Sequence, residues 1–399
     1  MPKLRFPEFW DAGEWEEKEL SEICEINPSV KSLPEKFVYI DLESVEAGQL
    51  LQKKIISRNG APSRAQRLLK KGDVVFQMVR PYQKNNYFFL PDDDLNYVAS
   101  TGYAQLRAYE SNKYLFQYLH DDGFVGRVLA KCTGSNYPAI NSSDLAKILV
   151  QVPEPKEQQK IADCLSSHDA LITAHSQKLE TLKAHKKGLM QQLFPREGET
   201  FPRLRFPEFR DAGEWEEKKL GDAAVFLNGR AYKKEELLTK GKYRVLRVGN
   251  FFSNDEWYYS DLELDENKYC DDGDLLYAWS ASFGPRIWRG EKVIYHYHIW
   301  KVVANKGVDK KFLYILLEYE TERMKSSSAN GLGLLHITKN TIENWESNFP
   351  KIEEQKKIAD CLSSIDALIA AQDEKVEALK AHKKGLMQQF FPSPEDVGA

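Results

Sequence analysis

The chain contains an internal duplication, and this feature constrains its fold more than any other. Residues 4–20 recur as residues 204–220 with 15 of 17 positions identical. Residues 157–194 recur as residues 354–391 with 29 of 38 positions identical, whereas the long segments that separate these blocks have diverged almost completely. Because the period is far longer than the roughly 20 to 50 residues of a solenoid repeat, the sequence indicates a tandem duplication of a whole globular segment with its following helix.

Composition places the chain among ordinary globular proteins. Its 399 residues, 42% hydrophobic and 29% charged, suffice for roughly two to three domains that each bury a core. The formal net charge is −4, so any binding of nucleic acid has to depend on local basic patches. The five cysteines are widely spaced without a C-x-x-C pair, which excludes a disulfide framework and argues against a structural zinc site.

Residues 156–195 and 352–392 each predict one long helix, because apolar side chains recur there at heptad spacing between lysines and glutamates. From Ile161 to Leu193 such a helix rises by roughly 50 Å. We expect the two helices to pair as an antiparallel coiled coil, since this arrangement places the two short repeated blocks in equivalent positions. The predicted seam residues are Leu165, Ile172, Leu179, Leu182, Leu189, Leu362, Ile369, Val376, Leu379 and Leu386.

The apolar stripe of each helix is wider than a two-helix seam requires. The extra side chains include Leu171 and Met190 in the first copy, and Leu368 and Met387 in the second. Two interpretations remain open for them: they pack on the globular segments of the chain itself, or they form a docking face for a partner protein.

Each diverged segment predicts an α+β domain, because strand-like runs precede a helical segment in both. The expected strands are 37–40, 74–76, 97–99, 243–248, 275–279 and 293–303, and the expected helices are 114–129 and 312–324. The predicted fold class is therefore α+β, with two domains related by a pseudo-two-fold axis and separated by two long antiparallel helices. The predicted boundaries are a first domain at 1–155, a first spacer helix at 156–195, a linker at 196–203, a second domain at 204–351, a second spacer helix at 352–392 and a tail at 393–399.

Positive charge is concentrated in one run of each diverged segment. Residues 53–84 contain nine Lys or Arg and one Asp, and residues 226–250 contain seven Lys or Arg and two Glu. Side chains that stack on bases or read base edges, including Gln77 in the first segment, lie within or near these runs, which favours nucleic acid over a merely solvated surface. The predicted DNA-binding residues are Lys53, Lys54, Arg58, Arg64, Arg67, Arg80, Tyr82, Gln83, Lys84, Asn86, Arg230, Tyr232, Lys233, Lys234, Arg247, Trp279, Phe283 and Arg286.

The sequence contains no recognisable catalytic constellation. A phosphate-binding Gly-x-x-x-x-Gly-Lys-[Ser/Thr] loop is absent, and Asn27-Pro28-Ser29 lacks the second proline and the aromatic residue of an amino-methyltransferase motif. His296 and His298 lie two residues apart on a predicted strand, where they are a half-buried pair or a base contact more readily than metal ligands. No apolar run reaches the length of a membrane span or a signal peptide, so we expect a cytoplasmic protein.

The duplicated order of these motifs resembles the specificity subunits of Type I restriction–modification systems. The resemblance covers essentially the whole chain, and its strength is the repeated order of the motifs. It is carried by the Leu-Arg-Phe-Pro-Glu-Phe openings at Leu4 and Leu204, the Gly-Asp turns at Gly72 and Gly273, the glycine loops 134–140 and 331–337, and the helices that run to Gly-Leu-Met-Gln-Gln.

This resemblance implies a non-catalytic subunit whose two target-recognition domains each read half of a bipartite double-stranded DNA target. It implies two modification subunits as partners, which bind S-adenosylmethionine and methylate adenine, and restriction subunits that can join to cut DNA using ATP. The chain itself is then expected to bind no cofactor and no metal. Base-reading residues vary between members of the family, so the candidate residues above come from charge and side-chain chemistry alone.

The predicted helix length agrees with this expectation. A rod of roughly 50 Å compares with about 34–36 Å for one turn of DNA, so two reading heads would lie about one turn apart. Because the two diverged segments differ, the two half-sites should differ as well. The alternative is a coiled-coil scaffold whose end domains bind proteins.

Overall fold

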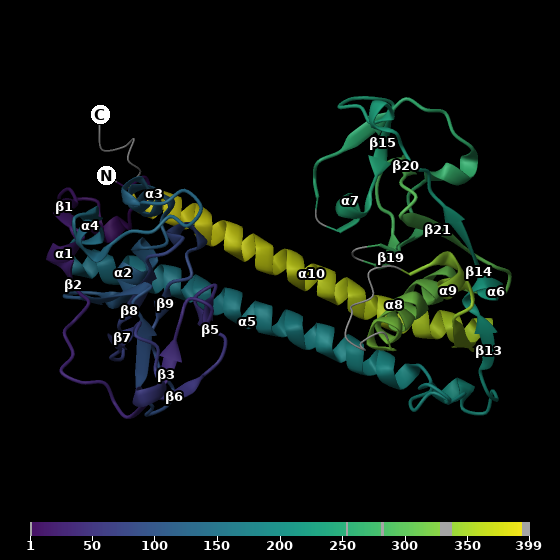
Figure 1. The fold of residues 1–399 in the computed structure, drawn as a ribbon, viewed down its shortest axis with the longest axis horizontal. Coiled ribbons are helices and arrows are strands. Elements are labelled where there is room, and N and C mark those ends of the chain that lie inside the picture. Colours follow the sequence, from purple (N-terminus) through teal and green to yellow (C-terminus); the bar gives the residue numbers. More distant parts are fainter. Residues whose placement is uncertain (1, 253, 281–282, 328–336, 393–399) are drawn as a thin grey trace. The chain divides into compact units, whose positions relative to one another are not determined.

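In this computed structural model, residues 2–252, 254–280, 283–327 and 337–392 are described, and Figure 1 shows their fold. The chain forms two compact units. Unit 1 comprises Met1–Gln177 with Glu374–Ala399, and unit 2 comprises Lys178–Asp373. Each unit therefore combines one diverged segment with parts of both long helices.

Unit 1 is an α+β domain. Its strands are β1 (Glu16–Glu19), β2 (Cys24–Ile26), β3 (Lys36–Ile40), β4 (Val45–Glu46), β5 (Gln49–Leu50), β6 (Ile55–Ser57), β7 (Ala65–Leu68), β8 (Val74–Gln77), β9 (Tyr87–Phe88), β10 (Tyr97–Ser100), β11 (Tyr103–Ala108) and β12 (Leu149–Val152). Its shorter helices are α1 (Leu20–Ile23), α2 (Asn112–Tyr118), α3 (Asp122–Lys131) and α4 (Ser142–Ala146). One sheet has the order β6-β3-β10-β7, in which β3 and β10 run parallel. The second sheet, β2-β11-β8-β9, is antiparallel throughout.

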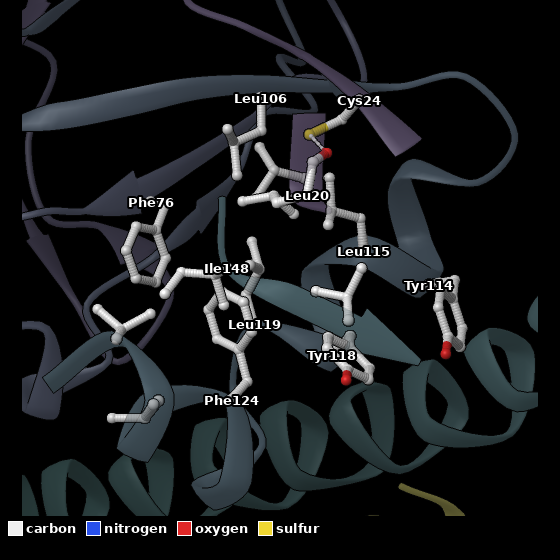
Figure 2. Close-up of a cluster of buried hydrophobic side chains, with 14 of the residues drawn as sticks. Leu20, Cys24, Phe76, Leu106, Tyr114, Leu115, Tyr118, Leu119, Phe124 and Ile148 are labelled. Carbon is white, nitrogen blue, oxygen red and sulfur yellow. Dashed lines mark hydrogen bonds between the residues drawn. The ribbon is translucent and has the colours of Figure 1, made fainter. Parts of the chain in front are cut away.

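The main core of unit 1 lies between the antiparallel sheet and the helices. Alternate residues of β8 face opposite sides of this sheet: Val74 and Phe76 join the helix-side core, whereas Val75 joins a second cluster with β3 and β10. Figure 2 shows the helix-side core, in which Phe76 packs with Tyr118 and Phe124. The ring centroids of Phe76 and Phe124 are 5.8 Å apart in an edge-to-face arrangement.

Unit 2 repeats this architecture with different side chains. Its strands are β13 (Glu216–Lys219), β14 (Ala224–Asn228), β15 (Tyr243–Leu246), β16 (Tyr258–Ser260), β17 (Tyr269–Cys270), β18 (Leu275–Ala278), β19 (Gly284–Ile287), β20 (Val293–Tyr295), β21 (Ile299–Ala304) and β22 (Glu346–Phe349). Its shorter helices are α6 (Leu220–Ala223), α7 (Val248–Phe252), α8 (Lys310–Ser327) and α9 (Lys339–Glu343). The sheet orders are β16-β15-β20-β17, with β15 and β20 parallel, and β14-β21-β18-β19. The prediction of related α+β folds in the two diverged segments is confirmed.

The two long helices are α5 (Pro155–Leu193) and α10 (Ile352–Phe390), each of 39 residues. Within unit 1 the first part of α5 packs against the last part of α10, where the Lys383 ammonium lies 2.6 Å from the Asp169 carboxylate. Within unit 2 the repeat-equivalent pair, Lys186 and Asp366, is 2.7 Å apart. In both units residues near the end of one helix meet residues near the start of the other, as antiparallel pairing requires.

Side chains of the predicted seam are buried or half-buried in both helices. Leu165 is fully buried in the core of unit 1, where Leu386 packs against it. Leu362 is fully buried in the core of unit 2, and Leu189 packs against this core. The predicted helices, and the apolar seam along them, are confirmed.

The short repeated blocks bind the helix ends in the same way in both units. The Leu4 amide donates to the Gln389 carbonyl over 3.0 Å, and the Leu204 amide donates to the Gln192 carbonyl over 2.9 Å. Gln389 and Gln192 are equivalent positions near the ends of α10 and α5. The chain's first residues therefore meet the end of its last helix, as the expected equivalence of the two copies requires.

An arginine in each short block forms a two-pronged ion pair with a glutamate at the start of the long helix of its own unit. In unit 1 the Arg5 guanidinium donates to both oxygens of Glu157 over 2.8 and 2.7 Å, and in unit 2 Arg205 binds Glu354 over the same distances. Both glutamate side chains are 1% exposed. The bidentate geometry makes these the strong class of charge-assisted hydrogen bonds.

Several element boundaries differ from the sequence prediction, and three of these differences concern the division or the start of an element. The expected helix 114–129 is divided into α2 and α3, because the Asp121 side chain accepts the Phe124 amide and caps a new helix. The expected strand 293–303 is two strands, β20 and β21, which belong to different sheets. Helix α5 begins at Pro155, where a proline is favoured as the first helical residue. Of the loop expected at 331–337, only Ile337 lies within the described residues.

Candidate nucleic-acid interface

In unit 1 three of the four predicted arginines, Arg64, Arg67 and Arg80, lie on segments that meet at the turn joining β10 to β11, Thr101–Gly102. The Thr101 amide donates to the Arg64 carbonyl over 2.8 Å, and Arg67 lies on β7 opposite Ala99 of β10. The Met78 amide donates to the Gly102 carbonyl over 3.0 Å, which brings the end of β8 to the same turn, two residues before Arg80. The backbone contacts therefore bring the segments of Arg64, Arg67 and Arg80, here called the arginine cluster, to the same turn.

Arg67 is the most enclosed of the three arginines by its pKa and its hydrogen bonding. Its side chain is half-buried, and this burial lowers the pKa of the guanidinium because water is partly removed from the charge. Its Nε has no hydrogen-bond partner among the described residues. No carboxylate in the described part of the chain forms an ion pair with any member of the arginine cluster.

The loop after β8 carries the remaining candidates of this segment. Tyr82 is 50% exposed and Gln83 is also exposed, so both can reach a ligand. Asn86 is only 1% exposed, and its Oδ1 accepts the Gln77 amide over 2.9 Å. The DNA contact predicted for Asn86 is therefore wrong for this conformation, because its side chain is bound inside the protein and positions the loop instead.

Lys53, Lys54 and Arg58 lie apart from the arginine cluster, on the opposite edge of the sheet, directly before and after β6. The Lys53 ammonium is 2.7 Å from Asp92 and 2.8 Å from Asp93, so two carboxylates already bind it. The Arg58 guanidinium donates to a backbone carbonyl. All three side chains are exposed, but the structure does not bring them together with the arginine cluster.

In unit 2 the candidates converge on the equivalent turn, His296–His298, between β20 and β21. The Arg230 amide donates to the Tyr295 carbonyl over 3.0 Å, and the Trp279 amide donates to the His298 carbonyl over 3.1 Å. The Tyr232 ring stacks on His296 with centroids 6.4 Å apart. Arg247 directly follows Leu246, whose carbonyl accepts the His296 amide. Segments far apart in sequence thus assemble one aromatic and basic cluster.

The prediction that His296 and His298 lie on one strand is wrong. They lie at the two ends of this turn. Their ring centroids are 4.8 Å apart. Burial lowers the pKa of His296 to about 4, with smaller contributions from His298 and Arg247, so the ring is neutral at physiological pH. A neutral imidazole offers one donor and one acceptor, which suits recognition of a base edge.

The other candidates of unit 2 lie in the loop after Tyr232 and at the edge strand β19. Lys233 and Lys234 are exposed in the loop that follows Tyr232. Phe283 precedes the edge strand β19, with the Lys325 ammonium 5.2 Å from its ring centre, and Arg286 lies on β19. The Nε of Arg247 has no hydrogen-bond partner among the described residues, as was found for Arg67.

Part of the charge counted in the sequence is neutralised by carboxylates from elsewhere in the chain. Lys84 forms an ion pair over 2.6 Å with Asp122, a residue that lies outside the basic run 53–84. Arg244 binds Glu291, which lies outside its basic run, over 3.0 Å. The net charge of each basic run therefore overstates the positive charge that its surface presents.

The four predicted docking residues fall into two groups. Leu171 is 47% exposed and the repeat-equivalent Leu368 is 57% exposed, so both remain available to a partner. Met190 is half-buried against the core of unit 2, and Met387 is 8% exposed within the core of unit 1. For these two methionines the structure favours the alternative, packing on the chain's own domains.

One contributor to the site was missed by sequence reasoning. The Tyr137 ring lies beneath the Arg80 guanidinium at 4.2 Å and is 64% exposed. Its position in the glycine loop after Gly134 was the one sequence feature that could have indicated it.

Among the described residues no group of three or more His, Cys, Asp or Glu is arranged to hold a metal ion. No helix in the described ranges combines the length and apolar character needed to span a membrane.

A family model of the Type I restriction modification DNA specificity domain matches the chain twice, at residues 12–184 and 212–381. The chain belongs to this family. The two matches coincide with the two duplicated halves, so each half carries one copy of the DNA specificity domain.

Known members of the family resemble the chain in sequence and fold. The Type I restriction enzyme MjaVIII specificity subunit of Methanocaldococcus jannaschii is 27% identical over 273 residues, covering 64% of this chain and 64% of that protein, which is less than two thirds of its length. A chain from a solved structure on complex assembly and conformational transition of the type I R-M system has a TM-score of 0.58 at 21% identity, covering 95% of this chain and 97% of that chain. The Type-I restriction-modification S subunit from M. genitalium has a TM-score of 0.57 at 14% identity, covering 98% and 99%. At these identities the two structures show the shared fold alone.

Proposed function

We propose that the chain is the DNA-recognition subunit of a Type I restriction–modification complex and that each unit reads one half of a bipartite DNA target. The observation that carries the proposal is the repeated site. In both units, basic side chains and exposed polar or aromatic groups come from segments that meet at the turn between the two central strands, Thr101–Gly102 in one unit and His296–His298 in the other. Guanidinium groups and amides of this kind bind phosphates and base edges.

The two half-sites should differ in sequence. The cluster of unit 1 offers arginines and amides, whereas that of unit 2 adds indole, phenol and imidazole groups such as Trp279 and His296. Different donors and acceptors select different base edges in the major groove. The target is therefore an asymmetric sequence whose central bases are not read by this subunit.

We also assign partners and cofactors. Two modification subunits bind the chain, with Leu171 and Leu368 as candidate contact residues, because each is a large exposed apolar side chain at an equivalent place on a long helix. S-adenosylmethionine is bound by those subunits, and ATP by any restriction subunits that join. The chain acts without catalysis of its own, in keeping with the matched family description, which names DNA specificity.

The long helices set the number of unread bases between the half-sites. Both α5 and α10 contain residues of both units. Inserting seven helix-forming residues after Gln177 and another seven after Asp373 preserves the heptad pattern and lengthens each helix by about 10 Å. We expect the half-sites to stay the same and their separation to increase by about 3 bp, at ~3.4 Å per base pair. Sequencing the methylated bases in cells that contain the chain and its modification subunit measures the separation.

The same insertion in α5 alone is the matched control. It displaces one helix against the other and should abolish methylation instead of moving the half-sites. An unchanged separation in the double insertion, with methylation retained, contradicts the spacing role of the helices.

A further inference from the structure

The hairpin loop between β8 and β9 adopts a backbone that side chains other than glycine rarely adopt. Arg80 has φ 54° and ψ 55°, and Lys84 has φ 55° and ψ 30°, so both are left-handed. They flank the short turn Pro81–Gln83. Such residues persist where surrounding contacts fix them, and they are frequent at ligand sites.

Both ends of this loop are anchored. The Arg80 amide donates to the Pro138 carbonyl over 2.7 Å, and its guanidinium lies over the Tyr137 ring. The Lys84 ammonium donates to the His120 carbonyl over 2.7 Å and to Asp122 over 2.6 Å. The residues between the anchors, Tyr82 and Gln83, are therefore presented on a fixed backbone.

Two buried amides fix the orientation of the Gln83 side chain. The backbone N–H of Asn85 can only donate, and it donates to the Gln77 Oε1 over 3.1 Å. The Gln77 Nε2 must then face outward as a donor, and it donates to the Gln83 Oε1 over 2.9 Å. Gln77 itself is held by Asn86, which accepts its backbone amide, and both are at most 2% exposed. This chain of bonds leaves the Gln83 Nε2 as the group that faces away from Gln77.

We propose that Gln83 reads one base of the first half-site by donating its amide hydrogens to an acceptor on the major-groove edge, with Gln77 as the residue that positions it. The inference rests on the proposed function and names the reading group within it. Guanine O6 and N7, adenine N7 and thymine O4 are acceptors at this edge, whereas cytosine presents only a donor. Tyr82, 50% exposed beside it, supplies a ring for contact with the neighbouring sugar or base.

The test uses the whole chain with its modification subunit and reads the methylated motif by sequencing. Gln83→Glu keeps an oxygen toward Gln77 and replaces the outward donor by an acceptor. We expect one position of one half-site to change toward a base with a major-groove donor, cytosine or adenine, by roughly 10-fold in relative methylation. The other half-site should not change.

A second variant alters the buried residue, which cannot touch DNA. In the Gln77→Glu variant the new carboxylate still accepts the backbone N–H of Asn85, but it presents an oxygen to Gln83 in place of a donor. The side-chain amide of Gln83 must then rotate, so that its NH2 group donates to Glu and its carbonyl faces outward. The same base position should then change in the same direction, a result that simple loss of stability would not give. Tyr109→Ala is the matched control, since Tyr109 is 63% exposed just beyond the other end of β11, and it should leave the motif unchanged.

The outcomes separate this inference from the proposed function. If the wild-type complex methylates a bipartite motif and Gln83→Glu changes neither half-site, the reading role of Gln83 is overturned while the function stands. If the wild-type complex yields no bipartite motif, the proposed function fails and the inference fails with it.

Discussion

Replacing Arg64, Arg67 and Arg80 together by alanine is expected to lower the affinity for duplex DNA by roughly 100-fold, at about 1 kcal/mol for each lost contact. These side chains have no carboxylate partner among the described residues, and the Nε of Arg67 has no acceptor there. Their charge is therefore available to DNA phosphates. We also expect the affinity of the variant to depend less on salt. The slope of the logarithm of affinity against the logarithm of salt concentration should become shallower by up to ~0.9 for each phosphate contact removed. Fluorescence anisotropy over a salt series measures both quantities.

The matched control removes the same charge elsewhere in unit 1. Lys31, Lys36 and Lys147 are exposed lysines outside the arginine cluster, so their triple alanine variant should bind DNA with nearly the wild-type affinity and salt slope. Equal losses in the two triple variants would indicate non-specific attraction. No loss in the arginine variant would favour the alternative, a scaffold whose end domains bind proteins.

The second large effect concerns stability. Arg5→Ala leaves the Glu157 carboxylate, 1% exposed, without its ionic partner. Loss of one partner from a buried ion pair costs about 3 kcal/mol or more, because the remaining charge is neither solvated nor paired. We expect a corresponding fall in the free energy of unfolding, measured by denaturant titration. Replacing both partners with leucine should restore most of the lost free energy of unfolding, since no buried charge then remains.

Lys160→Ala is the control for this experiment. Lys160 pairs with Glu8 over 2.9 Å between the same block and the same helix, but both side chains are about half exposed. Water and salt screen such a pair, so its loss should have little measurable effect. If Arg5→Ala lowered the free energy of unfolding no more than Lys160→Ala does, the stabilising role of the buried ion pair between the short block and the helix would be contradicted.

The repeated blocks, the long helices and the α+β class could be predicted from the sequence because each depends on a local pattern. Heptad spacing appears within a few turns, and the duplication is visible by direct comparison. The division of residues 293–303 into β20 and β21 could not be predicted, since the apolar run continues while the chain changes sheets. The end of α2 was also hidden, because it depends on the side chain of Asp121 capping α3.

The candidate site was predictable in its segments but not in its arrangement. Arg67 and Arg80 could be found by charge, yet their meeting at one turn depends on strand pairing between distant segments. The neutralisation of Lys53 by Asp92 and Asp93 is likewise tertiary. Burial distinguishes Asn86 from Gln83, although the two are alike in chemistry and close in sequence.

The most direct measurement of the central claim is the set of methylated sequences in a host that contains only this chain and its modification subunit. The account predicts adenine methylation within one asymmetric motif of two unlike half-sites, separated by a fixed number of unspecified bases. Exchanging the aromatic and basic residues at the His296–His298 turn of unit 2 should change only one half-site. This half-site should be the one that the Gln83→Glu variant leaves unchanged. A continuous or palindromic motif, or no sequence-specific methylation, would contradict it.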